Sequence, residues 1–176
     1  MKFRYFFLAM GMLVIMAACE LTESADKDGF FPDDGTRRQM VQFKLDSLTD
    51  KSIIDSSQLE GQVLLVTFFA TWCPPCIQEI PTLVELQKSF SKKNFSVVAF
   101  SVDEGDLELL FKIIDKYEIN YPVLLADANV INGFGGVTGI PVTYLVNRKG
   151  ELVNKYLGYI GHDTLEKAIK KLLAAG

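Results

Sequence analysis

The sequence predicts a single α/β domain whose central sheet is covered by helices on both faces. Apolar runs of strand length alternate along the chain with segments whose apolar residues recur at helical spacing, a pattern typical of right-handed strand–helix–strand crossovers. With 176 residues, of which 49% are hydrophobic, the chain has room for the core of one domain. We expect this domain to span residues 38–176.

The first 18 residues are predicted to be a signal peptide. A basic start precedes the uncharged run 5–18, which is shorter than the roughly 20 apolar residues of a membrane span. Ala17 and Ala18 stand directly before Cys19, and this arrangement resembles the bacterial lipobox, in which the cysteine carries the lipid. An uncleaved anchor segment, or a cysteine that follows an ordinary cleavage site by chance, are the alternatives.

Residues 19–37 are predicted to form a flexible tether. They are polar and charged, contain Gly29, Pro32 and Gly35, and show no apolar periodicity, so they resemble a linker more than a packed element. Lysine and arginine residues are not gathered into a basic patch in this chain of net charge −4. Because nucleic-acid binding requires such a patch, we expect no nucleic-acid partner.

The domain begins with a predicted hairpin and a fully apolar strand. Residues 40–48 alternate between apolar and polar side chains, and the polar stretch 49–52 leads to Ile53 and Ile54, which fits an N-terminal edge hairpin. Residues 63–69 are β-branched, aromatic or aliphatic and carry no charge. Such a run is typical of a strand that is buried on both faces of a sheet.

Further helices and strands follow in alternation. Apolar spacing and turn residues predict a helix over 73–90 that contains Pro81, a strand over 95–102, a helix over 106–118, a strand over 122–126, and a hairpin of 142–146 and 152–156.

The last helix is predicted to start at an Asp163 cap. Glu166 lies three residues later, as in a capping box, and His162 is assigned to the preceding turn. In the helix over 106–118, the predicted buried stripe includes Leu110, Phe111 and Ile114.

Two cysteines follow directly after the apolar strand, in the stretch Trp72-Cys73-Pro74-Pro75-Cys76. Proline suits the first positions of a helix, where the backbone N–H has no intrahelical partner, so Cys73 is predicted at the N-cap. Cys76 then lies on the same face, one turn later. A zinc site needs about four ligands, and the chain offers only three cysteines and one histidine. We therefore interpret the pair as a reactive dithiol and expect no metal.

The motif WCPPC, with Glu79, Pro81 and the distant segment 139–143 (GIPVT), resembles the thioredoxin superfamily, in particular its membrane-tethered TlpA-like or ResA-like branch. The resemblance covers roughly residues 38–174 and includes the inserted helix and strand over 106–126, which plain thioredoxins lack. It implies a thioredoxin-like fold with a central mixed sheet and an N-terminal hairpin. It also implies a cis peptide bond before Pro141, which would face the dithiol, and no cofactor.

The two cysteines are expected to have different roles. A thiolate attacks a disulfide, and a helix N-terminus favours the thiolate, so Cys73 is the predicted nucleophile and should be exposed. Cys76, shielded inside the helix, is predicted to resolve the mixed disulfide. An inert structural disulfide is the alternative.

Cys76 needs a base that removes its proton. Plain thioredoxins use an aspartate on the preceding strand, at the position that Thr67 occupies here, and a threonine cannot serve. The resemblance implies Glu79 instead, with a pKa that partial burial could raise. A solvated surface glutamate without a role is the alternative. Trp72 and the backbone of Ile140 are predicted to bind substrate, next to Pro141.

The sequence thus predicts a thiol–disulfide oxidoreductase that reduces protein disulfides outside the cytoplasm. The resemblance implies a monomer with a lipid anchor on the periplasmic side of an envelope membrane, a DsbD/CcdA-like membrane protein as electron donor, and cytochrome c maturation as one client pathway.

Two other functions are alternatives. Peroxiredoxins of the same fold have a threonine three residues before the reactive cysteine and a proline four residues earlier, where this chain has Ala70 and Val66. A redox-inert binding module would be expected to lose a cysteine or the facing proline, and neither is lost.

Overall fold

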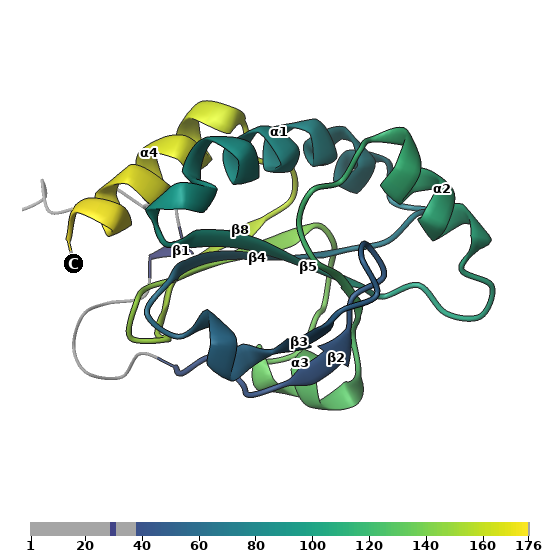
Figure 1. The fold of residues 1–176 in the computed structure, drawn as a ribbon, viewed down its shortest axis with the longest axis horizontal. Helices are drawn as coiled ribbons and strands as arrows, with labels where there is room; N and C mark the ends of the chain where they lie inside the picture. Colours follow the sequence, from purple (N-terminus) through teal and green to yellow (C-terminus); the bar gives the residue numbers. More distant parts are fainter. Residues whose placement is uncertain (1–28, 31–37, 176) are drawn as a thin grey trace, which may run out of the picture.

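A computed structural model of the chain describes residues 29–30 and 38–175 (Figure 1). Its centre is a six-stranded mixed sheet in the order β1-β8-β7-β4-β5-β6. Within the described residues, no helix is long and apolar enough to span a membrane. The strands of this sheet are β1 (Gly29–Phe30), β4 (Val63–Phe69), β5 (Phe95–Ser101), β6 (Val123–Leu125), β7 (Val142–Val146) and β8 (Leu152–Leu157).

Helices cover the sheet in two layers (Figure 1). Three of them, α1, α2 and α4, lie on one face, and the short helix α3 lies on the other face together with a separate hairpin of β2 and β3. Two apolar clusters fill these two layers. The helices are α1 (Pro74–Phe90), α2 (Glu108–Lys116), α3 (Ala128–Gly133) and α4 (His162–Ala174), with 3-10 turns η1 (Ser56–Leu59) and η2 (Ser91–Lys93).

Strand β4 is the middle of the fold, and all of its residues are buried, as the sequence predicts. It runs parallel to β5 on one side and antiparallel to β7 on the other, where Thr67 pairs with Thr143 and Phe68 with Val142. Because of this register, the C-terminal end of β4 and the start of β7 meet at one edge of the sheet. The mixed sheet and the thioredoxin-like arrangement are therefore confirmed.

The N-terminal hairpin is present but forms its own sheet. Its strands are β2 (Lys44–Asp46) and β3 (Ile53–Asp55), and a bridge from Ser47 to Leu124 connects it with β6. Phe43, just before β2, is buried and stacks edge-on against Phe100 of β5. The hairpin thus covers a face of the main sheet instead of extending its edge, because Leu45 and Ile54 pack against the second cluster.

Three details of the helices differ from the predictions. α4 begins at His162 with Gly161 as its N-cap, so Asp163 lies in the first turn, where its charge still favours the helix dipole. Glu166 pairs with Lys170 over 2.9 Å and does not form a capping box. In α2, Leu110, Ile113 and Ile114 share the buried face, whereas Phe111 points outward and is 45% exposed. The spacing i, i+3, i+4 leaves Phe111 off that face.

Besides the two 3-10 turns, the structure adds a helix and a strand that the sequence did not reveal. Helix α3 is capped by Asp127, whose carboxylate accepts a hydrogen bond of 2.7 Å from the N–H of Val130. Strand β1 lies inside the predicted tether 19–37 and pairs with Asn154 and Lys155 of β8. The predicted signal peptide and Cys19 lie outside the described residues.

Candidate active site

The dithiol lies where β4 turns into α1, at the edge where β7 begins. Cys73 is the N-cap residue of α1 with an extended backbone, and Pro74 and Pro75 occupy the first two helical positions, as predicted. Neither proline has an N–H, so neither leaves a donor unpaired at the helix start. Within α1, Pro81 is also present as predicted.

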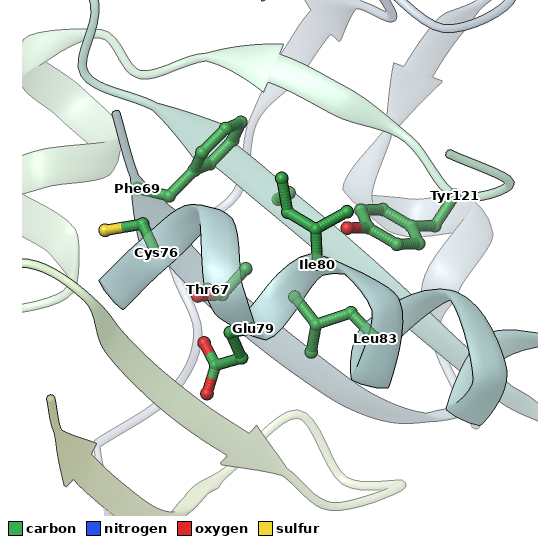
Figure 2. A pocket seen from close by; sticks show the side chains of 8 residues that line it. Thr67, Phe69, Cys76, Glu79, Ile80, Leu83 and Tyr121 are labelled. Carbon is green, nitrogen blue, oxygen red and sulfur yellow. The ribbon is translucent and has the colours of Figure 1, made fainter. Parts of the chain in front are cut away.

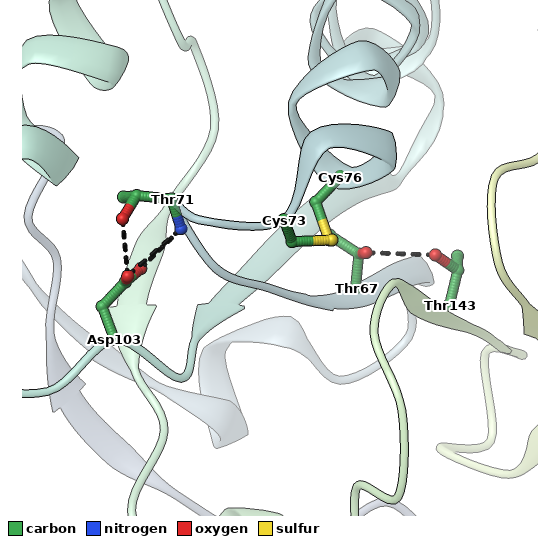
Figure 3. Close-up of a disulfide and its surroundings, with 6 residues drawn as sticks. All are labelled: Thr67, Thr71, Cys73, Cys76, Asp103 and Thr143. Carbon is green, nitrogen blue, oxygen red and sulfur yellow. Dashed lines mark hydrogen bonds between the residues drawn. A yellow bond between two sulfur atoms is a disulfide. The ribbon is translucent and has the colours of Figure 1, made fainter.

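Cys73 and Cys76 form a disulfide bond (Figure 3), so the structure represents the oxidised state. The Cys73 side chain is only 4% exposed and that of Cys76 2% exposed. The expected exposure of Cys73 is therefore wrong for this state, because both sulfur-bearing side chains pack into the apolar cluster between α1 and the sheet. Trp72, the preceding residue, is 67% exposed, which favours a docking role over a core role.

The peptide bond between Ile140 and Pro141 is cis, as the resemblance implied. Since Val142 pairs with Phe68, Pro141 lies beside the end of β4 that leads to the dithiol. The carbonyl of Pro141 accepts a 2.8 Å hydrogen bond from the N–H of Gly158. Among the described residues, the backbone of Ile140 has no hydrogen-bond partner, so it is free to pair with an extended peptide.

Glu79 is the only charged residue that is buried among the described residues, with 1% of its surface exposed. Its Oε1 atom accepts a 3.2 Å hydrogen bond from the backbone N–H of Ile160. Burial raises the pKa of Glu79 from 4.5 to about 7, and the hydrogen bond from Ile160 opposes this rise. The interpretation of Glu79 as a solvated surface residue is therefore wrong.

A small cavity joins Glu79 to Cys76 (Figure 2). Its volume of about 10 Å³ is close to the smallest that can hold one water molecule. Thr67 and the buried Tyr121 also line it. Burial is the larger cause that raises the pKa of Tyr121, and the charge of Glu79 is the smaller one. The cavity thus has one buried carboxyl group and the side chain of Cys76 in its lining.

Two hydroxyl groups connect the strands next to the disulfide (Figure 3). Thr143 of β7 donates a 3.0 Å hydrogen bond to Thr67 of β4, and both side chains are buried. Thr67 is thus part of a neutral cross-strand pair, in agreement with the prediction that it is no base. The contribution of Thr143 was not foreseen.

Sequence reasoning also missed Asp103, which follows β5. Its carboxylate accepts hydrogen bonds from the N–H and the hydroxyl group of Thr71, which stands two residues before Cys73 (Figure 3). The only available signal was an acidic residue directly after a buried strand. Within the described part of the chain, no group of histidine, cysteine and acidic residues could hold a metal ion.

Comparisons with known proteins agree with this geometry. The model of the AhpC/TSA family matches residues 36–155. A thiol-disulfide oxidoreductase ResA from Halalkalibacterium halodurans is 30% identical over 142 residues, which are 78% of this chain and 79% of that protein. A second ResA, from Bacillus thuringiensis (strain Al Hakam), is 27% identical over 97% of this chain and 98% of its own length.

A solved structure supports the same relationship. The crystal structure of a thiol:disulfide interchange protein of the thioredoxin family from Chlorobium tepidum TLS has a TM-score of 0.74 and is 30% identical. It covers 80% of this chain, and this chain covers 99% of it.

The raised pKa of Glu79 predicts an unusual dependence of stability on pH. Between pH 4.5 and about 7 the folded protein holds a proton that the unfolded chain releases, so the free energy of unfolding should fall as the pH rises through this window and level off above it. The full loss should be on the order of 3 kcal/mol. Urea unfolding of the oxidised protein at a series of pH values measures it.

The substitution Glu79→Gln should flatten the curve of unfolding free energy against pH. It should also stabilise the protein at pH 8, because no buried charge remains at this position. Glu108→Gln changes an exposed glutamate on α2 and should leave the curve as it is. A wild-type curve that rises between pH 4.5 and 7 and parallels that of Glu79→Gln would contradict the assignment.

Proposed function

Since this chain belongs to the AhpC/TSA family and is a thiol–disulfide oxidoreductase, we propose that it reduces disulfide bonds in other proteins outside the cytoplasm. The observation that supports this most directly is the Cys73–Cys76 pair at the start of α1, next to cis-Pro141. A strand–turn–helix unit presents the cysteines. The backbone of Ile140, which has no hydrogen-bond partner among the described residues, lies at the same edge.

The reduced protein acts in two exchange steps. The Cys73 thiolate attacks one sulfur of the substrate disulfide, a mixed disulfide forms, and the other substrate sulfur leaves as a thiolate that takes up a proton. Cys76 then loses its proton and attacks the Cys73 sulfur, which releases the second substrate sulfur as a thiolate. Two electrons pass from the dithiol to the substrate, and the protein ends in the disulfide form seen here.

Cys73 is the attacking residue because it stands at the N-cap, at the positive end of the helix dipole. The stabilisation of its thiolate is modest, since Pro74 and Pro75 have no N–H to donate. The N–H of Ile77 is also engaged, because it donates a 3.1 Å hydrogen bond to the carbonyl of Cys73. This leaves the N–H of Cys76 as the nearest donor, an arrangement that favours a reducing dithiol.

Glu79 is the base that receives the proton of Cys76. Its carboxyl lines the same cavity as Cys76, and burial brings its pKa to about 7. A general base is most effective when its pKa lies near the working pH. Glu79 can therefore accept the proton in one half of the cycle and return it in the other.

Client proteins bind as extended peptides at the dithiol edge. The backbone of Ile140 has no partner among the described residues and can pair with a peptide strand. The exposed indole of Trp72 adds apolar contact on the other side of Cys73. Pro141 has no N–H, so its backbone cannot donate a hydrogen bond to the Cys73 sulfur, which stays available to the substrate.

The N-terminal sequence supports a proposed cellular arrangement. Residues 1–18 are the signal peptide, Cys19 carries a lipid that anchors the chain to an envelope membrane, and residues 19–37 connect it to the domain over 38–176. A DsbD/CcdA-like membrane dithiol reduces the protein again, and cytochrome c maturation is one client pathway. Mass spectrometry of the membrane fraction tests the anchor, and a soluble mature protein that begins elsewhere would contradict it.

Peroxide reduction receives no support from the site. Ala70 and Val66, at the positions where peroxiredoxins have threonine and proline, are both fully buried and offer no hydroxyl group to a bound peroxide.

The roles of the two cysteines can be separated by trapping. Cys76→Ser should attack once and remain as a mixed disulfide with its client, because nothing resolves the bond. Cys73→Ser should form no such adduct and should not reduce a model protein disulfide such as insulin. Mass spectrometry of the adducts identifies the attached protein and the cysteine used. Trapping by Cys73→Ser together with normal turnover of Cys76→Ser would reverse the assignment.

The base function of Glu79 predicts a kinetic effect of Glu79→Gln. The substitution removes the proton acceptor with little change of shape, so the exchange rate should fall by up to about 10²-fold. Stopped-flow kinetics between pH 5 and 9 would measure this, and the inflection near pH 7 should disappear. A pH–rate profile identical to that of the wild type would rule out this role.

A further inference from the structure

We propose that Asp103 is a positioning residue, which holds the turn before α1 in place so that Cys73 keeps its geometry when the disulfide is opened. The proposal rests on the dithiol function given above and adds a residue outside the WCPPC motif. Asp103 lies in the loop after β5, 30 positions beyond Cys73 in the sequence.

The contacts of Asp103 form a compact clamp. Its Oδ1 atom accepts a 2.7 Å hydrogen bond from the Thr71 hydroxyl group, and the Thr71 N–H lies 3.1 Å from Oδ1 and 3.0 Å from Oδ2. The hydroxyl of Ser101 donates a 2.7 Å hydrogen bond to Oδ2 and accepts one of 3.0 Å from the N–H of Asp103. Since Ser101 is buried at the end of β5, the carboxylate is fixed to the sheet on one side and to the turn on the other.

The turn needs such a clamp because few other hydrogen bonds hold its conformation. Residues 70–73 belong to no helix or strand. Cys73 makes no side-chain capping bond, although capping residues usually secure a helix start. Within the turn, the N–H of Cys73 donates to the carbonyl of Ala70 over 3.2 Å. Among the described residues, the bonds to Asp103 are the side-chain hydrogen bonds that connect this turn to the segment at the end of β5 (Figure 3).

The redox state changes how much the clamp matters. In the oxidised protein the Cys73–Cys76 bond also ties the turn to the first turn of α1. Reduction by two electrons and two protons breaks this bond and leaves two thiols, so the clamp then provides a larger share of the interactions that hold the turn. Loss of the clamp should therefore lower the stability of the reduced state more than that of the oxidised state. It should shift the redox equilibrium toward the disulfide.

The test compares Thr71→Val and Thr71→Ser in the purified full chain, because neither changes a charge. Valine removes the hydroxyl that donates to Asp103, whereas serine keeps it. The equilibrium with reduced and oxidised glutathione is read by thiol alkylation and by the fluorescence of Trp72, the single tryptophan of the chain. We expect Thr71→Val to favour the disulfide about threefold over the wild type, and Thr71→Ser to match the wild type.

Asp103→Asn weakens the hydrogen bonds that the carboxylate accepts from Thr71 and Ser101 and should favour the disulfide about tenfold, which corresponds to a potential about 30 mV more negative. Its matched control is Asp55→Asn. Asp55 accepts the same pair of bonds, from the N–H (3.0 Å) and hydroxyl (2.7 Å) of Ser57, but it lies in the hairpin on the other face of the sheet. This control should leave the glutathione equilibrium unchanged.

Urea unfolding of both redox states gives an independent readout. The clamp variants should lose more stability as reduced than as oxidised protein. Equal losses with an unchanged glutathione equilibrium would show a purely structural role and would overturn the proposal. A shift toward the dithiol in Asp103→Asn, with Thr71→Val unchanged, would show that Asp103 acts through its charge and would also overturn it. None of these measurements needs a protein substrate, so they remain decisive if the protein proves not to reduce protein disulfides.

Discussion

The burial of Glu79 beside Cys76 is the constraint on which the active site depends. A carboxyl group with 1% exposure is costly to ionise, so its pKa rises to about 7. The protein tolerates this cost because Oε1 has one backbone donor, at Ile160. In the proposed mechanism, this loss of stability provides a proton acceptor for Cys76.

The surrounding fold fixes the positions of the two cysteines relative to that carboxyl group. β4 is buried along its whole length and delivers the turn to the edge where β7 starts at Val142. The hydroxyl pair of Thr67 and Thr143 supports one side of the disulfide, and the bonds between Thr71 and Asp103 support the other (Figure 3). The chemistry therefore takes place on a helix start whose position is fixed by strands on both sides.

Local signals made most of the fold and the dithiol predictable from the sequence. The uncharged run 63–69 identified β4, and Pro74 after Cys73 identified the start of α1. Features that depend on contacts between residues far apart in the sequence could not be predicted from local signals. The bonds of Asp103 join residues 32 positions apart, and the low exposure of Cys73 arises from the cluster around it. Helix α3 has only six residues, too few for a clear apolar periodicity. The sequence also does not distinguish Gly161 from its neighbours as the N-cap of α4.

The reduction potential of the Cys73–Cys76 couple tests the central claim, that this protein is a reductant, most directly. The claim follows from the few N–H donors at the helix start, since a weakly stabilised thiolate makes the disulfide harder to reduce and the dithiol a better donor. Equilibration of the wild-type protein with dithiothreitol buffers gives the value. The account predicts a potential near that of thioredoxin, about −270 mV. A value above roughly −180 mV, toward the strong oxidants of this superfamily, would contradict it.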